Sequence, residues 1–244
     1  MGFVEVRNLT KGFGELLVLD NISFDVSKGE FLCIVGPTGC GKTTFLNSLA
    51  RLYDINGGSI RINGEEVNLK KHRLAYIMQE YSTMSWLTVK ENIMFGLKIK
   101  GVDKKTLERN SNEAMDLVGL NGFKDFYPNQ LSASMLQRVA IARAFAVKPD
   151  LLLMDEPYGQ LDLELRFKLE DELLNIWEKT NTTVVFITHN IEEAVYLSER
   201  ILILTNKPTT IKQEYVNDLP RPRDITSPDF IHVRNAVTDL IKWW

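Results

Sequence analysis

The residues with the clearest chemical meaning lie in one short stretch, residues 36–43, which reads GPTGCGKT. It fits the pattern G-x-x-x-x-G-K-[ST], in which glycines let backbone N–H groups converge on phosphate without a Cβ in the way. Lys42 adds a full positive charge, and the Thr43 hydroxyl can ligate Mg²⁺. The apolar run 31–35 predicts a buried strand before the loop, and the apolar spacing within 45–49 predicts a helix after it. The stretch is therefore predicted to bind nucleotide phosphates.

The whole loop and the start of its helix are expected to contact the nucleotide. These residues are Gly36, Pro37, Thr38, Gly39, Cys40, Gly41, Lys42, Thr43 and Thr44. The helix points its positive N-terminal end at the phosphates. Cys40 stands just before that end and close to Lys42, so its thiol is expected to ionise easily and to react with thiol reagents. The alternative is an inert small residue at a free position of the loop.

Two neighbouring acids, Asp155 and Glu156, follow the apolar run 151–154. A buried strand that delivers an aspartate to Mg²⁺, with a glutamate beside it, is the Walker B arrangement. Taken alone, the same letters fit a strand that simply runs into an acidic turn. The phosphate loop upstream favours the metal-binding interpretation.

Composition limits the classes of protein that the chain can represent. It has 244 residues, a net charge of −3 and a pI near 5.7, which argues against nucleic acid as the main partner. It has two cysteines, too few for a disulfide framework, so the expected compartment is the cytosol. The sequence contains no apolar run near the ~20 residues that span a bilayer, and its N-terminus lacks a signal-peptide core.

The first part of the chain alternates between apolar and polar residues. Residues 3–6 and 22–26 are predicted as antiparallel strands, with a loop at 11–14 that exposes Phe13. Residues 59–67 are predicted to form a hairpin across the Asn63-Gly64 turn.

The remainder of the chain changes from helical to alternating strand and helix. The spacing is helical over about 80–147, including a helix that begins after Ser132 as its N-cap. Strands return at 151–154 and 183–187 with a helix between them, which predicts a parallel sheet. Strands at 201–205 and 211–215, a Pro-rich linker at 219–223 and a final helix over 230–241 complete the chain.

These motifs together resemble those of ABC transporter ATPase subunits, over nearly the whole chain. The resemblance rests on the loop 36–43, Gln79, Leu131-Ser132, Asp155-Glu156, Leu161-Asp162 and His189, in the order and spacing typical of the family. Segments 86–93, 127–128 and 219–223 resemble the nitrate, sulfonate and taurine importer branch. The implied fold is α/β: a P-loop NTPase core with a mixed sheet, an antiparallel β-subdomain and an inserted α-helical subdomain. The implied division is an ATPase domain at 1–220, with its helical part at about 80–147, and a C-terminal extension at 221–244.

The resemblance also implies roles for single residues. Phe13 would stack on adenine, and Asp162 would lie between two copies. Glu156 would be the general base, and His189 would touch the γ-phosphate. Gln79 would reach Mg²⁺ and the attacking water. The implied metal ligands are thus Thr43, Gln79 and Asp155, and the implied cofactors are ATP and Mg²⁺.

The signature loop departs from the family pattern. The family usually has Leu-Ser-Gly-Gly-Gln, whereas here Leu131-Ser132 is followed by Ala133, Ser134 and Met135. In the family this loop caps the ATP that the opposite subunit binds, so Ser132 and Ser134 are expected to contact that nucleotide. Without the two glycines, closure and turnover are expected to be weaker.

The resemblance implies an ATPase that closes as a homodimer or heterodimer around ATP and drives import through separate membrane permease subunits. It would lie in the cytoplasm on the inner face of the cell membrane and serve a substrate-binding protein indirectly, without nucleic acid. Helical residues 80–147 would dock on the permease, with Met84 and Trp86 as candidate contacts.

Two other classes compete with this interpretation. A soluble ABC ATPase acting in cofactor assembly fits the same motifs. A P-loop kinase does not explain Leu131-Ser132 and His189.

Overall fold

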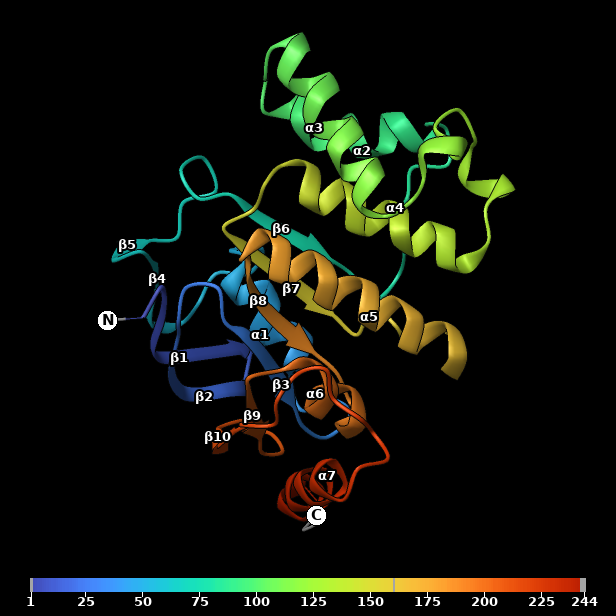
Figure 1. Cartoon of the computed structure of the whole chain (residues 1–244). Coiled ribbons are helices and arrows are strands. Elements are labelled where there is room, and N and C mark those ends of the chain that lie inside the picture. Colours follow the sequence, from blue (N-terminus) through green and yellow to red (C-terminus); the bar gives the residue numbers. More distant parts are fainter. Residues whose placement is uncertain (1, 160, 242–244) are drawn as a thin grey trace. The chain divides into compact units, whose positions relative to one another are not determined.

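The computed structural model describes residues 2–159 and 161–241. The chain divides into two compact units: Met1–His72 with Thr183–Trp244, and Arg73–Thr182. The first unit contains both ends of the sequence and is coloured blue to cyan and orange to red in Figure 1, and the second is coloured from blue-green through green to gold.

One sheet of the first unit is antiparallel, with strand order β2-β1-β4-β5. Its strands are β1 (Val4–Phe13), β2 (Leu16–Val26), β4 (Gly57–Ile62) and β5 (Glu65–Glu66). The predicted hairpin at 59–67 is confirmed: Asn63 and Gly64 have φ values of 53° and 79°, the left-handed backbone that a tight hairpin turn needs. The predicted loop at 11–14 is wrong, since residues 11–13 pair with β2 and only the turn after Phe13 is irregular.

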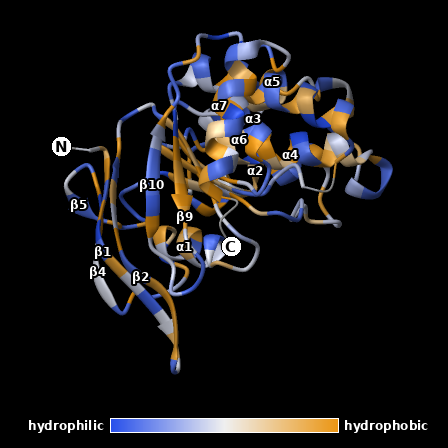
Figure 2. Ribbon diagram, turned by 90° about the horizontal axis from the view of Figure 1, so that it is seen from below, coloured by the Kyte–Doolittle hydropathy of each residue, from blue (hydrophilic) through white to orange (hydrophobic). Residues whose placement is uncertain are grey.

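The other strands of the first unit form a mixed sheet, as predicted. Strand β3 (Phe31–Val35) runs parallel to β8 (Thr183–Ile187) and to β9 (Arg200–Leu204), while β10 (Ile211–Val216) is antiparallel to β9. Figure 2 shows β9 in the colour of hydrophobic residues beside a more hydrophilic β10. The helices of this unit are α1 (Lys42–Leu49), α6 (Ile191–Leu197) and α7 (Pro228–Ile241). Helix α6 was not predicted, because seven residues are too few to show a clear period.

The second unit contains a short parallel pair and most of the helices. Strand β6 (Leu74–Ile77) pairs with β7 (Leu151–Asp155). The helices are α2 (Val89–Ile99), α3 (Lys104–Leu117), α4 (Ala133–Ala146) and α5 (Leu163–Thr180), with 3-10 turns η1 (Asn121–Phe123) and η2 (Pro128–Gln130). Helices α2, α3 and α4 pack on one another, so the predicted helical region is confirmed. Thr88 and Glu91 form a capping box that fixes the start of α2.

The C-terminal segment is more closely packed than its prolines suggest. Residues 219–223, predicted as a linker, include Arg223, whose exposed fraction is 9%. The boundaries 1–220 and 221–244 stay a prediction, and residues 242–244 lie outside the described residues. None of the helices that the structure describes is long and apolar enough to pass through a bilayer.

Candidate functional site

The predicted phosphate loop lies between β3 and α1 in the first unit, which is the context that its pattern requires. The backbone reverses through Gly39, at φ 75°, and Gly41, at φ 117° and serving as the N-cap of α1. Cys40 N donates to Pro37 O at 3.2 Å, which closes the turn. The first N–H groups of a helix have no intrahelical acceptor, so the start of α1 supplies donors for an anion.

The ammonium group of Lys42 is held over this loop. Its Nζ donates to the carbonyls of Gly36 at 3.0 Å and Pro37 at 3.1 Å, and the residue is only 6% exposed. Thr43, by contrast, is exposed, at the first turn of α1. One charged donor is thus fixed within the loop, and one hydroxyl is open to a ligand.

Two glycines of the loop have no room for a side chain. A Cβ on Gly41 would lie 2.7 Å from a methyl carbon of Val18. A Cβ on Gly36 would lie 3.0 Å from Cβ of Leu204 and 3.1 Å from the Cys40 sulfur. The positive φ of Gly41 and the nearby Val18 methyl both favour glycine there, and a Cβ at Gly36 would force the Leu204 or Cys40 side chain to shift.

The Cys40 prediction is wrong in its chemistry. The thiol is 2% exposed, and burial raises its pKa, although the positive charge of Lys42 acts in the opposite direction. Burial outweighs the charge because an apolar environment disfavours the thiolate. Cys40 is therefore a protonated residue of the loop whose side chain is buried in the core.

His189 lies at the same edge of the sheet as the phosphate loop. It is exposed and directly follows Thr188, whose N–H donates to Ile34 O at 3.2 Å. Because β3 and β8 are parallel neighbours, the segments that leave their carboxyl ends come out side by side. The structure thus brings His189 and the loop together within the first unit.

The predicted adenine residue, Phe13, belongs to a small exposed cluster at the end of β1. Its exposed fraction is 45%, and Tyr53 meets it edge to face at 5.4 Å between ring centroids. The Lys11 ammonium lies 4.6 Å from the Phe13 ring centroid. Sequence reasoning included Lys11 in the segment 11–14 but gave it no role, and it missed Tyr53, which is far from Phe13 along the chain and carries no local pattern.

In the second unit, the predicted polar residues follow two parallel strands. Asp155 ends β7 and is 6% exposed, with the Tyr76 hydroxyl at 3.4 Å from its Oδ2. Glu156 follows with φ 46°, an unusual backbone for a residue with a side chain and one that often marks a functional site. Gln79 is exposed just beyond β6, and a Cβ on Gly159 would lie 4.0 Å from its Nε2. Gln79 and the turn after Glu156 are thus neighbours.

The segment after Gln79 is held by two buried or half-buried side chains. Asn92 is fully buried; its amide donates to the carbonyls of Met84, Leu87 and Thr88 at 3.0–3.1 Å, and its oxygen accepts from Met84 N at 2.8 Å. Arg143 of α4 donates to Ser82 O at 2.8 Å. Trp86 lies on this fixed segment and is 74% exposed.

The signature segment begins helix α4, as predicted. Ser132 is the N-cap, and its Oγ accepts from Met135 N at 3.4 Å. The hydroxyl of Ser134 lies 3.0 Å from that of Ser132. Asp162 likewise caps α5, accepting from Leu165 N at 2.9 Å, and is exposed. Their expected contacts with a second subunit stay a prediction.

Comparison with known proteins decides the family. The sequence model of the ABC transporter family matches residues 19–159. An uncharacterized ABC transporter ATP-binding protein of Methanocaldococcus jannaschii is 44% identical over 243 residues, covering 98% of this chain and 91% of that protein. The chain belongs to the ABC transporter ATP-binding family. An aliphatic sulfonates import ATP-binding protein of Bacillus cereus is 42% identical over 98% of this ABC subunit and 96% of its own length.

Solved structures agree with the assignment. A dimeric ABC transporter cassette aligns with this ABC subunit at a TM-score of 0.77 and 30% identity, covering 89% of this chain and all of that one. A second cassette structure, described as a post-hydrolysis state bound to ADP and phosphate, matches with the same TM-score at 29% identity and the same coverage. The predicted fold is confirmed, and the chain is an ATPase of this family.

The oxygen donors of this ABC subunit suit Mg²⁺. Mg²⁺ is bound by one or two protein oxygens together with waters and phosphate, and not by a cage of several side chains. The Thr43 hydroxyl in the first unit and the Asp155 carboxylate in the second are oxygen donors of this kind. No cluster of three metal-binding side chains occurs within 2–159 and 161–241.

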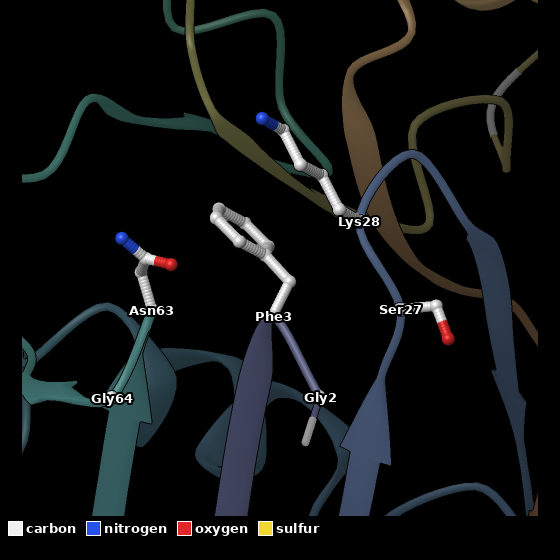
Figure 3. Close-up of a pocket in the computed structure, with 6 residues that line it drawn as sticks. All are labelled: Gly2, Phe3, Ser27, Lys28, Asn63 and Gly64. Carbon is white, nitrogen blue, oxygen red and sulfur yellow. The ribbon is translucent and has the colours of Figure 1, made fainter.

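One further cavity of the ABC subunit contains none of the predicted site residues. It has a volume of about 360 Å³ and is lined by Gly2, Phe3, Ser27, Lys28, Asn63 and Gly64. Figure 3 shows the Phe3 ring between the side chains of Asn63 and Lys28. Lys28 and Asn63 are exposed, and Lys28 precedes β3 whereas the phosphate loop follows it.

Proposed function

We propose that this ABC ATPase powers the import of a small anionic substrate of the sulfonate type through a separate membrane permease. The 42% identity to an aliphatic sulfonates import protein, over almost the full length of both chains, supports this substrate class. The subunit would lie on the inner face of the cell membrane, held there by the permease.

The site residues take their roles from their chemistry. The loop residues 36–44 bind the phosphates, Lys42 neutralises their charge, and Phe13 stacks on the base. Thr43, Asp155 and Gln79 hold Mg²⁺, which when bound would offset charge on the phosphates. Glu156 orients the attacking water and accepts its proton, and His189 contacts the γ-phosphate.

One observation carries the proposal: the Lys42 ammonium and the exposed Thr43 stand together at the start of α1, on a loop that turns through Gly39 and Gly41 at positive φ. The Lys42 ammonium is fixed 3.0 Å from Gly36 O, and the exposed Thr43 lies at the first helical turn. His189 lies at the same edge of the sheet, two residues beyond the end of β8, the strand next to β3. This set provides positive charge, oxygen ligation and a further donor for a polyphosphate.

Replacing Glu156 by glutamine tests the hydrolytic role. We expect Glu156→Gln to keep ATP affinity within about 2-fold and to lower the turnover rate by at least about 10²-fold, the usual contribution of a positioned base. The matched control is Glu178→Gln, which changes an exposed glutamate of α5 in the same way. Binding is measured by fluorescence titration and turnover by phosphate release. Undiminished hydrolysis by Glu156→Gln would show that Glu156 is not the general base.

A second ATPase subunit is the expected partner in closure. The similarity to a dimeric ABC cassette supports two cassettes facing each other, either two copies of this chain or this chain with a related one. In that arrangement Ser132 and Ser134 would reach the nucleotide of the partner, and Asp162 would lie between the copies. ATP binding would close the pair and hydrolysis would release it.

The permease would dock where the second unit exposes aromatic side chains. Trp86, Phe123, Phe126 and Tyr127 are exposed by 74%, 37%, 39% and 44%. Their segments are joined, because Val89 N donates to Phe126 O at 2.9 Å. Trp86 lies on the segment after Gln79 that Asn92 holds in place. A cytoplasmic segment of the permease is the proposed occupant of this aromatic surface.

Cofactor assembly by a soluble ABC ATPase is the alternative. The two functions differ in their partners, since only an importer needs an integral membrane protein. Affinity capture from detergent-solubilised membranes of the native cell, analysed by mass spectrometry, separates them. Recovery of a permease encoded beside this chain supports import, and recovery of only soluble biosynthetic proteins would favour the alternative.

A further inference from the structure

The C-terminal segment 217–241, here called the C-terminal arm, contacts both ends of helix α6. This helix begins two residues after His189 and has only seven residues. Short helices are marginally stable by themselves, so their position depends on tertiary contacts. Figure 1 shows α7, which forms most of the arm, next to α6.

The backbone between His189 and α6 is fixed by a cap. The Asn190 side chain accepts from Glu192 N at 3.0 Å and Glu193 N at 3.4 Å, and Asn190 N donates to Thr188 Oγ1 at 2.9 Å. His189 lies between Thr188 and Asn190. A shift of α6 is therefore passed directly to His189.

The arm binds the C-terminal end of α6 through a buried guanidinium. Arg223 donates to the carbonyls of Val195 at 2.7 Å, Tyr196 at 3.0 Å and Ser198 at 2.7 Å. Asn217 adds bonds to Val195 O at 2.8 Å and Ser198 O at 2.9 Å. The last carbonyls of a helix lack intrahelical donors, and a cation there also complements the helix dipole.

Arg223 keeps its charge in this position. Burial lowers its pKa to about 10, with the nearby Arg221 acting in the same direction. The group is still protonated at neutral pH, so a full charge is available to these carbonyls. A buried cation surrounded by acceptors resists displacement, because moving it would leave both partners unsatisfied.

The arm also contacts the N-terminal end of α6, through an ion pair. Arg234 of α7 pairs with Glu192 at 3.3 Å, three residues after His189. Helix α7 is anchored by Phe230, Val233 and Val237, which are 1%, 9% and 0% exposed. Both ends of α6 are thus tied to one packed segment.

We infer that the C-terminal arm sets the position of His189, with Arg223 and Arg234 as positioning residues for its contact with the γ-phosphate. The inference rests on the proposed function, in which His189 makes that contact. In this inference the C-terminal arm holds His189 where it can contact the γ-phosphate, which ATP has and ADP lacks. The arginines act through α6 and do not touch the nucleotide.

The test measures how strongly the full-length chain prefers ATP over ADP, by competition with a fluorescent nucleotide. Arg234→Glu places like charges at the Glu192 contact. We expect it to lower the preference for ATP over ADP about 3-fold. One hydrogen bond to a charged group provides ~10-fold, and the variant should lose only part of it. ADP affinity should stay within about 2-fold, because ADP lacks the γ-phosphate. Asn235→Glu, next along α7 and exposed, is the matched control and should change nothing.

Two further variants separate positioning from general damage. Adding Glu192→Arg to Arg234→Glu restores the ion pair and should restore the preference. Arg223→Lys keeps the charge but not the guanidinium fork, so it should also weaken the preference for ATP while the chain stays folded by circular dichroism. In a His189→Ala background, Arg234→Glu should have no further effect.

The outcomes are distinct. If Arg234→Glu leaves the preference unchanged, or lowers it equally with and without His189, the arm does not act through His189 and the inference is overturned, while the proposed function stands. If His189→Ala by itself leaves the preference for ATP intact, His189 does not contact the γ-phosphate, and the inference falls together with that part of the proposed function.

Discussion

At the scale of single residues, the phosphate loop shows how burial can outweigh charge. Cys40 lies just before a helix N-terminus and close to Lys42, two features that favour a thiolate. The folded chain nevertheless buries its sulfur against Gly36, where a Cβ would come within 3.1 Å of it. Removal from water raises the pKa, and the neighbouring charge compensates only in part.

Cys40 should therefore react slowly with alkylating reagents. At pH 7.5 we expect the native chain to be carbamidomethylated at Cys40 at least about 10-fold more slowly than the chain unfolded in urea, because the thiol is both protonated and inaccessible. Peptide mass spectrometry over time measures this. Fast modification of native Cys40 that ATP prevents would contradict the burial.

The raised pKa also has a consequence for stability. The thiol ionises more readily in the unfolded chain, so its contribution to folding is complete below the unfolded pKa and is lost as pH rises through the folded value. The stability of the native chain should thus decline in the alkaline range, where unfolded Cys40 becomes a thiolate.

At the scale of elements, helix α4 shows that the altered signature sequence still builds a normal helix start. Ser132 caps it, and the positive-φ residues of the chain do not include Ala133 or Ser134. The freedom of glycine to adopt positive φ is therefore not needed here. Replacing the family's two glycines still has two costs. Ala133 and Ser134 add Cβ atoms where the partner's nucleotide would approach, and the Ser134 hydroxyl lies 3.0 Å from the Ser132 hydroxyl that would contact that nucleotide.

Restoring the glycines should speed turnover. We expect Ala133→Gly with Ser134→Gly to raise kcat in the assembled complex by up to about 10-fold, less than the 10²–10³-fold effect of a lost catalytic donor. Ser134→Ala separates the two costs, since it removes the contact between the Ser132 and Ser134 hydroxyls without adding glycine. Phosphate release by a homodimeric preparation measures the rate. A rate that stays the same or falls would favour a heteromeric transporter whose other ATPase supplies the intact loop.

At the scale of the whole molecule, the second unit exposes an aromatic surface made of Trp86, Phe123, Phe126 and Tyr127. Its most exposed member, Trp86, stands on a segment that Asn92 and Arg143 hold in place. An ordered, exposed tryptophan is typical of the centre of a protein interface. Ile99, at the other end of α2, is 71% exposed and provides a matched control.

Trp86→Ala should weaken permease capture without affecting the nucleotide site. We expect the affinity for the membrane partner to fall at least about 30-fold, the result of losing one interface hot spot of ~2 kcal/mol or more. Ile99→Ala should capture the partner as the native chain does, and both variants should bind ATP normally. Equal capture by Trp86→Ala and the native chain would place the docking surface elsewhere.

The sequence by itself determined the elements whose signals are local. The loop 36–43, the hairpin turn at Asn63-Gly64 and the Ser132 cap each depend on residue types within a few positions, so their patterns predicted them. Short continuous apolar runs likewise predicted β3, β7 and β8 as buried strands. The family, the fold and the ATPase activity followed from the order and spacing of these motifs.

Only the tertiary structure decided the features that depend on distant segments. In the folded chain Cys40 is buried and Tyr53 lies against Phe13. Arg223, predicted as a linker residue, donates hydrogen bonds to the carbonyls at the end of α6. Local sequence could not predict these contacts, because solvent exposure and hydrogen-bond partners are set by whichever segments pack nearby. The pKa of a thiol and the position of a seven-residue helix therefore depend on the folded chain as a whole.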